Sequence, residues 1–186
     1  VSFIVPAKAL QEVNRLIAGQ QEPIELTVTP TQSAALFKLD NIEVVTQLLQ
    51  GAFPNYSQLI PGSYDTRALV DLEEFARATK SASIFARDGS GIIRIIVSGG
   101  GEGDPGSLSV ESKAEELGEN EGKIDAKVDG EEAKIAFNSK YLSDVLEILE
   151  ETEVALETTT PSSPGVIRPI GNDSYVHVVM PMFVQW

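Results

Sequence analysis

Few residues in this chain are suited to catalysis. The sequence has no cysteine and a single histidine, His177. Without cysteine the chain can form no disulfide framework, thiol nucleophile or thiolate metal site, and one histidine is too few for a multi-histidine metal centre. We expect His177 to be an ordinary strand residue. We assign no catalytic residue, no metal ligand and no cofactor.

Carboxylates are the remaining candidates for acid–base chemistry. Glu115, Glu116, Glu119 and Glu121 lie close together, but in a stretch with Gly and Asn that is typical of a solvated turn. The Gly-rich run SGGGEGDPG, residues 98–106, lacks the Gly-Lys-Ser/Thr of a phosphate-binding loop and precedes no helix, so we interpret it as a surface loop. An enzymatic or small-ligand-binding α+β domain stays open as an alternative.

Basic residues that could contact phosphate lie in segments with helical periodicity. Lys8 and Arg15 are seven positions apart and Arg77 and Lys80 three apart, so each pair shares one helix face, and Lys140 begins a third helical segment. The chain as a whole has 28 acidic and 14 basic residues and a formal net charge of −14, which repels nucleic acid. Only local clustering of the bases could overcome that repulsion.

These helical segments belong to a repeat. The runs FIVPAKALQEVNRLI (residues 3–17) and IAFNSKYLSDVLEIL (135–149) share a β-type start, a Pro or Asn, a Lys, and apolar residues at helical spacing. The midpoint between Pro6 and Asn138 is residue 72, where ALVDLEEFARATKSASIF predicts another helix with Asp71 as N-cap and Glu74 completing a capping box.

Strand-like runs follow each helix, several of them alternating apolar and polar residues as antiparallel strands do. The unit is therefore βαβββ, repeated about two and a half to three times. We predict an α+β fold in which antiparallel sheets pack on helices. The predicted strands span residues 24–29, 33–39 and 42–49, then 92–98, 107–114, 123–128 and 133–137, and then 153–159, 165–170 and 174–183.

Composition agrees with an ordinary globular protein. Of the 186 residues 42% are hydrophobic, and no run reaches the roughly 18 apolar residues that cross a bilayer. The opening VSFIVPAKAL lacks the basic region and cleavage site of a signal peptide. We expect a cytoplasmic protein without membrane association.

Five linked stretches, in this order and spacing, resemble the bacterial DNA polymerase III β subunit, the sliding clamp. The resemblance implies the DNA-clamp fold, in which three domains, each of two βαβββ halves, form a head-to-tail dimeric ring around DNA. It implies that residues 1–56 are the second half of the middle domain, 57–66 the interdomain crossing, and 67–186 the complete third domain, so we expect a truncated chain. The stretches are LLQGAFPNYSQLIP, ASIFARDGSGIIRI, IAFNSKYLSDVL, SPGVIRP and YVHVVMPM.

The resemblance implies a non-enzymatic processivity clamp of the replicative DNA polymerase. Its implied partners are double-stranded DNA, held without sequence preference, the DNA polymerase III catalytic subunit, the clamp loader, other clamp-motif proteins, and a second copy in the full-length ring. The helices carrying Lys8, Arg15, Arg77, Lys80 and Lys140 would line the hole of that ring. Acidic residues on the same helices, such as Glu12, Glu73 and Asp144, predict a weakly positive lining.

A docking pocket for short Gln- and Leu/Phe-containing motifs is also implied, and its other wall would come from the first half of the middle domain. Peptides should therefore bind this chain weakly or not at all. The family often has a basic residue at the positions of Gln58 and Phe183, and the tail Val184-Gln185-Trp186 runs past the usual end, so Trp186 could fold back on the pocket, extend it or enter a neighbour's groove. The implied pocket residues are Pro54, Gln58, Leu59, Asn138, Tyr141, Pro164, Gly165, Val178, Val179, Met180, Pro181 and Met182.

The stretch SIFARDG, placed after the second helix, resembles the third-domain edge that meets the partner subunit. Ile84 and Phe85 would be its apolar contacts and Arg87 a charged contact at the rim. Burial in an ordinary core is the other interpretation of Ile84 and Phe85. A purely structural fragment that pairs through open sheet edges is a further alternative for the chain as a whole.

Overall fold

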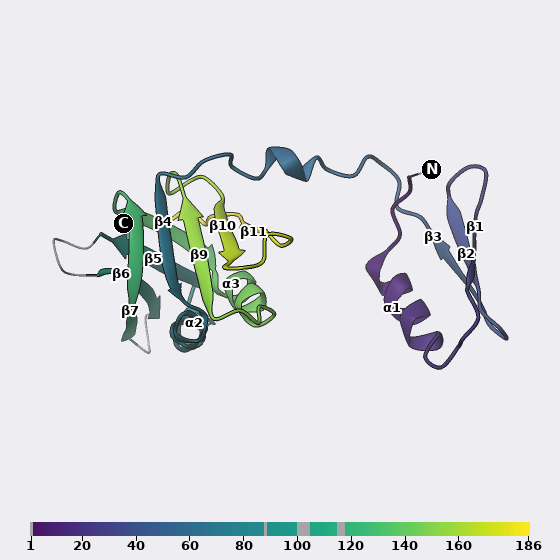
Figure 1. The fold of residues 1–186 in the computed structure, drawn as a ribbon, viewed down its shortest axis with the longest axis horizontal. Helices are drawn as coiled ribbons and strands as arrows, with labels where there is room; N and C mark the ends of the chain where they lie inside the picture. The colour runs from purple at the N-terminus through teal and green to yellow at the C-terminus, as the bar shows by residue number, and fades with distance from the viewer. Residues whose placement is uncertain (1, 88, 100–104, 115–117) are drawn as a thin grey trace. The chain divides into compact units, whose positions relative to one another are not determined.

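The chain folds as two units, Val1–Asn55 and Tyr56–Trp186. The computed structural model in Figure 1 describes residues 2–87, 89–99, 105–114 and 118–186. The βαβββ repeat occurs twice in the second unit and once in the first, where its first strand is reduced to a single bridge at Ile4. The antiparallel α+β fold predicted from the repeat is therefore confirmed.

The first unit contains helix α1 (Ala7–Leu16) and the antiparallel strands β1 (Glu25–Val28), β2 (Ala34–Lys38) and β3 (Glu43–Gln47), in the order β1-β2-β3. Ile4 adds a single bridge to Leu49 beyond β3. Alternation along β2 turns Ala35 and Phe37 inward. They form a small core with Val13 of α1, Leu39 and Leu48.

The second unit contains two repeats that share one eight-stranded antiparallel sheet, in the order β11-β10-β9-β4-β7-β6-β5-β8. The first repeat comprises β4 (Thr66–Asp71), α2 (Leu72–Arg87), β5 (Ile92–Ser98), β6 (Gly106–Ala114) and β7 (Gly118–Gly130). The second comprises β8 (Ala133–Asn138), α3 (Ser139–Leu146), β9 (Glu153–Thr158), β10 (Gly165–Pro169) and β11 (His177–Val179).

The two repeats of this unit exchange their first strands. Strand β4 pairs with β9 of the second repeat, and β8 pairs with β5 of the first. The first residue of each helix is also hydrogen-bonded to the other repeat. Leu72 N donates to Thr152 O and Ser139 N donates to Gly91 O, each at 2.9 Å. Each repeat therefore supplies an edge that the other repeat completes.

The helices begin where the sequence predicts. Asp71 Oδ1 accepts a hydrogen bond from Glu74 N at 2.9 Å, which confirms Asp71 as the N-cap of α2. The Glu74 carboxylate lies 3.6 Å from Arg77, so the reciprocal half of the capping box is replaced by an ion pair. Asn138 caps α3 by accepting from Lys140 N and Tyr141 N.

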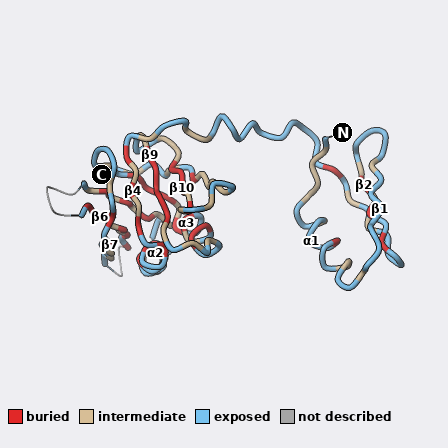
Figure 2. Tube along the Cα trace, viewed as in Figure 1, coloured by how far each residue is buried: buried red, intermediate tan, exposed pale blue. Residues whose placement is uncertain are grey.

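One apolar core joins both repeats of the second unit, and Figure 2 shows buried segments concentrated on its strands and helix faces. Helices α2 and α3 pack against each other as well as against the sheet. Burial of this apolar surface is the main force that stabilises the unit. The largest fully buried side chains include Phe75, Phe137, Ile93, Ile95, Leu108, Ile135, Leu142, Leu156 and Ile167.

Three element boundaries differ from the prediction. Helix α2 continues through Ile84 and Phe85 to Arg87, because no Gly or Pro interrupts it. Strand β7 begins at Gly118, so Glu119 and Glu121 lie in a strand paired with β6 rather than in a turn. Strand β11 is only three residues long, because Pro181 has no N–H to continue the ladder.

Two sequence features fall partly outside the described residues. The Gly-rich run joins β5 to β6, whose ends pair at Ser98 and Ser107, but residues 100–104 are not described. Glu115 and Glu116 also lie outside the described residues. Among the described residues, no helix is both long and apolar enough to cross a membrane.

Candidate functional site

The start of β10 and the end of β11 form one wall of the candidate site. Gly165 pairs with Val179, and Val166 pairs with Val178. Gly165 lies against the ring of Phe137, so close that a Cβ atom added there would be 2.4 Å from Cζ of Phe137. This contact packs β10 closely against the last residues of β8.

The segment after β11 continues this wall along β8. Met182 N donates to Ala136 O at 2.7 Å, two residues before the N-cap Asn138. Met180 is 60% exposed, and Met182 and Phe183 are exposed as well. The main chain is therefore held against the unit while three apolar side chains remain available for contact.

The start of α3 adds an aromatic side chain to the same region. Asn138 Oδ1 accepts hydrogen bonds from Lys140 N at 3.0 Å and Tyr141 N at 3.4 Å, which fixes the first turn. The side chain of Tyr141 is 60% exposed. We call the four exposed side chains Tyr141, Met180, Met182 and Phe183 the terminal apolar surface.

The crossing segment reaches the opposite side of β10. Gln58 ends a short 3₁₀ helix, Tyr56–Gln58, and Leu59 N donates to Tyr56 O at 2.9 Å. Both Gln58 and Leu59 are exposed. Pro61 and Tyr64, a few residues further on, line a small hollow with Pro164. Pro54 belongs to the first unit, so it is not placed relative to the other predicted pocket residues.

His177 lies in β11, as predicted, and is half-buried. The Tyr175 hydroxyl is 3.1 Å from its Nδ1 atom, and the two rings stack with centroids 6.2 Å apart. Burial holds the pKa of His177 below its ordinary value, so the ring is neutral at pH 7. A neutral, stacked imidazole fits a packing role.

Three of the five predicted DNA-facing bases pair with acids on their own helices. Arg15 Nε lies 3.0 Å from a Glu12 oxygen, and Lys140 Nζ lies 2.6 Å from Asp144. The hydrogen bond with Asp144 raises the pKa of Lys140, and the one with Arg15 lowers the pKa of Glu12. The third pair joins Arg77 to Glu74 at 3.6 Å.

Lys8 and Lys80 are the two remaining bases of this set. Both are exposed, and neither takes part in an ion pair within the part of the chain that the structure describes. They are therefore available to contact an external phosphate, whereas each of the three paired bases has a carboxylate beside it that weakens its attraction for phosphate.

The carboxylates proposed for acid–base chemistry include Glu119, which lies 2.6 Å from Lys113 on the neighbouring strand. The hydrogen bond to Lys113 lowers the pKa of Glu119, so this carboxylate is ionised and unsuited to donate a proton near pH 7. Across the described residues, no group of three or more His, Asp or Glu side chains is placed to hold a metal ion.

Family models match nearly the whole chain in two consecutive parts. Residues 1–55 match the central domain of the DNA polymerase III beta subunit, and residues 57–183 match its C-terminal domain. The chain belongs to the DNA polymerase III beta subunit family. The resemblance noted in the sequence is therefore confirmed.

Relatives in this family agree with the assignment. The chain is 32% identical over 183 residues to the beta sliding clamp of Staphylococcus aureus and 30% identical over 182 residues to that of Bacillus subtilis; each match covers 97% of this chain, and 46% and 47% of the relatives. The solved DNA polymerase III beta subunit of Thermotoga maritima matches with a TM-score of 0.83 and 25% identity over 100% of this chain and 48% of that one. The chain thus spans about half the length of these relatives.

The subunit-contact residues expected from the family lie on the last turns of α2 rather than after it. Ile84 and Arg87 are exposed, Phe85 is half-buried, and Ala86 between them is fully buried in the core. Helical spacing explains the difference, because Ala82 and Ala86 are four residues apart on the buried face. Ile84 is therefore not a core residue of this chain.

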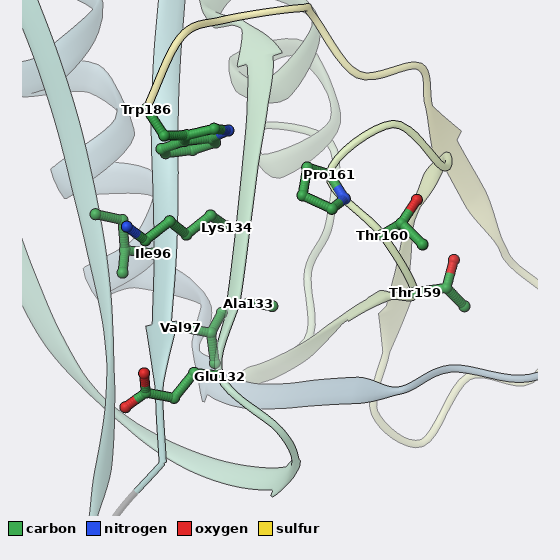
Figure 3. A pocket seen from close by; sticks show the side chains of 9 residues that line it. All are labelled: Ile96, Val97, Glu132, Ala133, Lys134, Thr159, Thr160, Pro161 and Trp186. Atoms are coloured by element: carbon green, nitrogen blue, oxygen red, sulfur yellow. The ribbon is translucent and has the colours of Figure 1, made fainter.

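A hollow that the sequence did not predict lies beside the C-terminal tail (Figure 3). Its volume is about 380 Å³. Trp186 stands over Lys134, with Nζ 5.8 Å from the ring centroid, and Arg94 donates to Gln185 O at 3.3 Å. The β5–β8 pairing brings together part of the lining, and the rest comes from the segment after β9 and from Trp186, so no local sequence signal could have identified the hollow. Its lining is Ile96, Val97, Glu132, Ala133, Lys134, Thr159, Thr160, Pro161 and Trp186.

Proposed function

We propose that this chain serves a DNA sliding clamp as a non-catalytic docking and tethering module. The observation that carries the proposal is the terminal apolar surface: its backbone is bound to β8, while Tyr141, Met180, Met182 and Phe183 remain exposed. Membership of the beta subunit family supports the same role. The named relatives are themselves beta sliding clamps.

The terminal apolar surface suits short peptide motifs with Leu or Phe anchors. Methionine side chains are flexible and polarizable, so one surface adapts to several apolar anchors. Tyr141 adds apolar area with a polar tip that can bond a glutamine of the motif. The proposed docking site also includes these residues of the second unit: Gln58, Leu59, Pro164, Gly165, Val178, Val179 and Pro181.

DNA tethering is the second part of the proposal. Exposed bases on α1, α2 and α3 face duplex DNA and contact phosphates without reading sequence. Lys8 and Lys80 contribute most, because Arg15, Arg77 and Lys140 each have an acidic partner. In the assembled ring, Ile84, Phe85 and Arg87 meet the partner subunit, and the replicative polymerase and the clamp loader dock on the terminal apolar surface.

The docking test is a fluorescence-anisotropy titration of a labelled peptide with one glutamine and Leu/Phe anchors against the 186-residue chain. We expect saturable, weak binding that falls at least about tenfold in the double variant Met180→Ala, Met182→Ala, as for loss of central apolar anchors. Ile148→Ala, which removes an equally exposed side chain elsewhere in the unit, should bind as the parent chain does.

Two results would overturn docking on this surface. One is unchanged affinity in the double variant. The other is absence of binding to this chain at peptide concentrations that saturate the Bacillus subtilis clamp, which would mean that the terminal apolar surface does not bind peptides in this chain.

The tethering test measures binding of a short DNA duplex as a function of salt. We expect weak affinity that falls with rising salt, and a smaller salt slope in the double variant Lys8→Gln, Lys80→Gln. Lys113→Gln is the matched control, because Lys113 is exposed but lies on strand β6 and pairs with Glu119. An equal loss in both variants would show that the helix faces do not contact DNA.

A further inference from the structure

Residues 182–186, which we call the C-terminal tail, lie along the free edge of β8. Strand β8 is the last strand of its sheet, so among the described residues its outer edge pairs with no other strand. Met182 N donates to Ala136 O on that strand at 2.7 Å, and Trp186 lies over Lys134, two residues earlier in β8. The tail therefore runs antiparallel to β8, toward the start of that strand.

The side chain of Arg94 makes a second contact with the tail. Arg94 lies on β5 and pairs directly with Ala136 on β8. Its Nη2 atom donates to Gln185 O at 3.3 Å. Directly paired residues of antiparallel strands have their side chains on the same face of the sheet. Because the side chain of Ala136 is only a methyl group, the longer side chain of Arg94 can pass over β8 and reach the tail.

Arg94 contacts the tail although an acidic residue lies beside it. On its other side Arg94 pairs with Glu111 of β6, and opposite charges at such positions attract each other. Among the described residues, however, the only hydrogen bond of the Arg94 side chain is the one to Gln185 O. Its Nε atom is buried, so the guanidinium lies partly out of water, where a charged hydrogen bond is stronger. Arg94 thus holds the tail rather than its acidic neighbour.

The indole ring of Trp186 makes the third contact (Figure 3). Lys134 Nζ lies 5.8 Å from the ring centroid, within the range of a cation–π interaction. The ring also lines the hollow described above, together with Ile96 of β5 and Pro161 of the segment after β9. With 48% of its surface exposed, Trp186 is half covered.

The contacts at Gln185 and Trp186 hold the tail beyond its exposed apolar residues. Before those residues, β11 is paired with β10 as far as Val179. Between these two anchored points, the main chain has one hydrogen bond to β8 among the described residues, the one from Met182. A segment with so few bonds opens at a low cost in free energy. The contacts of Gln185 and Trp186 therefore decide how firmly the tail is held.

We propose that Arg94 and Trp186 are positioning residues for peptide docking. They hold the tail along β8, so that Met182 and Phe183 are presented in one arrangement before a peptide binds. A surface that is ordered in advance loses less conformational entropy on binding, so its affinity is higher for the same contacts. This role rests on the proposed docking function, because the positioned side chains belong to the terminal apolar surface.

The first test needs no peptide, because Trp186 is the only tryptophan of the chain. Arg94→Gln should increase the quenching of Trp186 fluorescence by acrylamide and should speed hydrogen exchange at the amide of Met182. The matched control is Glu111→Gln, since Glu111 lies directly opposite Arg94 but on the strand away from the tail. Unchanged quenching and exchange in Arg94→Gln overturns the proposal, as does an equal change in both variants.

The second test is peptide affinity, measured by the same fluorescence-anisotropy titration. Arg94→Gln and Trp186→Ala should each raise the dissociation constant about three- to tenfold, the usual effect of ordering one or two side chains on binding. Trp186→Phe keeps an aromatic ring for Lys134 and should recover most of the affinity that Trp186→Ala loses. Glu111→Gln should bind as the parent chain does.

The results distinguish positioning from docking itself. A parent chain that binds the peptide no better than Arg94→Gln and Trp186→Ala overturns the positioning role and leaves docking intact. A parent chain that does not bind the peptide overturns docking, and the positioning role fails with it. Urea unfolding followed by circular dichroism should give the same midpoint for Arg94→Gln and the parent. A midpoint that falls together with the affinity would show that Arg94 only stabilises the fold, which also overturns the proposal.

Discussion

The two units are built from one repeat but differ in how well they bury it. In the second unit, paired repeats bury Phe75 and Leu142 completely, whereas Leu10 at the matching position of the first unit is 46% exposed. Each repeat supplies the apolar residues for one side of a core, and a second repeat supplies the other side. A βαβββ repeat of this kind is therefore half of a folding unit, and its stability depends on what pairs with it.

The largest expected effect compares matched helix positions. Phe75→Ala should lower the free energy of unfolding of the second unit by about 3–5 kcal/mol, because it opens a cavity in a closed core. Leu10→Ala should change the first unit by less than about 1 kcal/mol in dilute solution, because the side chain is half exposed already.

Urea denaturation followed by Trp186 fluorescence measures the second unit, since Trp186 is the chain's one tryptophan. Amide hydrogen exchange measures the first unit. Equal losses at the two positions would break the comparison.

A smaller effect tests how tightly the core of the second unit is packed. Gly165→Ala places a methyl group against the Phe137 ring and should cost about 1–3 kcal/mol by overpacking. The Phe137→Leu change should recover part of this loss when it is combined with Gly165→Ala. Gly62→Ala is the control, because a Cβ there meets nothing within 4 Å. Equal midpoints of urea unfolding for the two glycine variants would contradict close packing at Gly165.

The two kinds of helix start, with and without a side-chain cap, should differ by about 1 kcal/mol in what capping contributes to the free energy of unfolding. Asn138→Ala removes both hydrogen bonds that cap α3 and should destabilise the second unit by about that amount, whereas Asn138→Ser keeps a capping oxygen. Pro6 starts α1 without a side-chain cap, so the first unit has no equivalent contribution to lose. Thermal unfolding of the two Asn138 variants checks this; identical melting temperatures would argue against the cap.

The smallest effect concerns pH. Burial lowers the pKa of His177 in the folded chain, so the unfolded chain takes up the proton first as the pH falls. Its contribution to stability is present above the unfolded pKa of about 6.5 and is lost as the pH falls through the folded value. The second unit should therefore lose more stability between pH 7.5 and pH 5 in the parent chain than in the His177→Gln variant. Matching pH profiles for parent and variant would show that His177 does not contribute.

The repeat could be predicted because it depends on local signals. Asp71 and Asn138 mark helix starts through their capping oxygens, and alternation marks the strands that follow. The ends of the helices and strands were predicted less accurately. Arg87 extends α2, and Pro181 stops β11, because a helix continues until something breaks it and a ladder stops where a donor is missing.

The candidate site, too, could be predicted from the sequence only in part. Tyr141, Met180 and Met182 could be selected from the resemblance to the family, but their exposure depends on backbone bonds to Asn138 and Ala136. Only the side-chain positions show that, among the described residues, Arg15 and Lys140 form ion pairs whereas Lys8 and Lys80 do not, although Glu12 and Asp144 were visible as neighbours in the sequence. The hollow beside Trp186 joins segments far apart in the sequence.

By itself, the sequence determined the repeat, the fold class and the family, because periodicity, capping residues and linked motifs are local properties of the chain. Tertiary structure alone decided which copies of the same apolar position are buried, since burial depends on a partner that pairs across the sheet. Leu10 and Phe75 have the same place in their repeats. Only pairing of the repeats makes one of them core and leaves the other exposed.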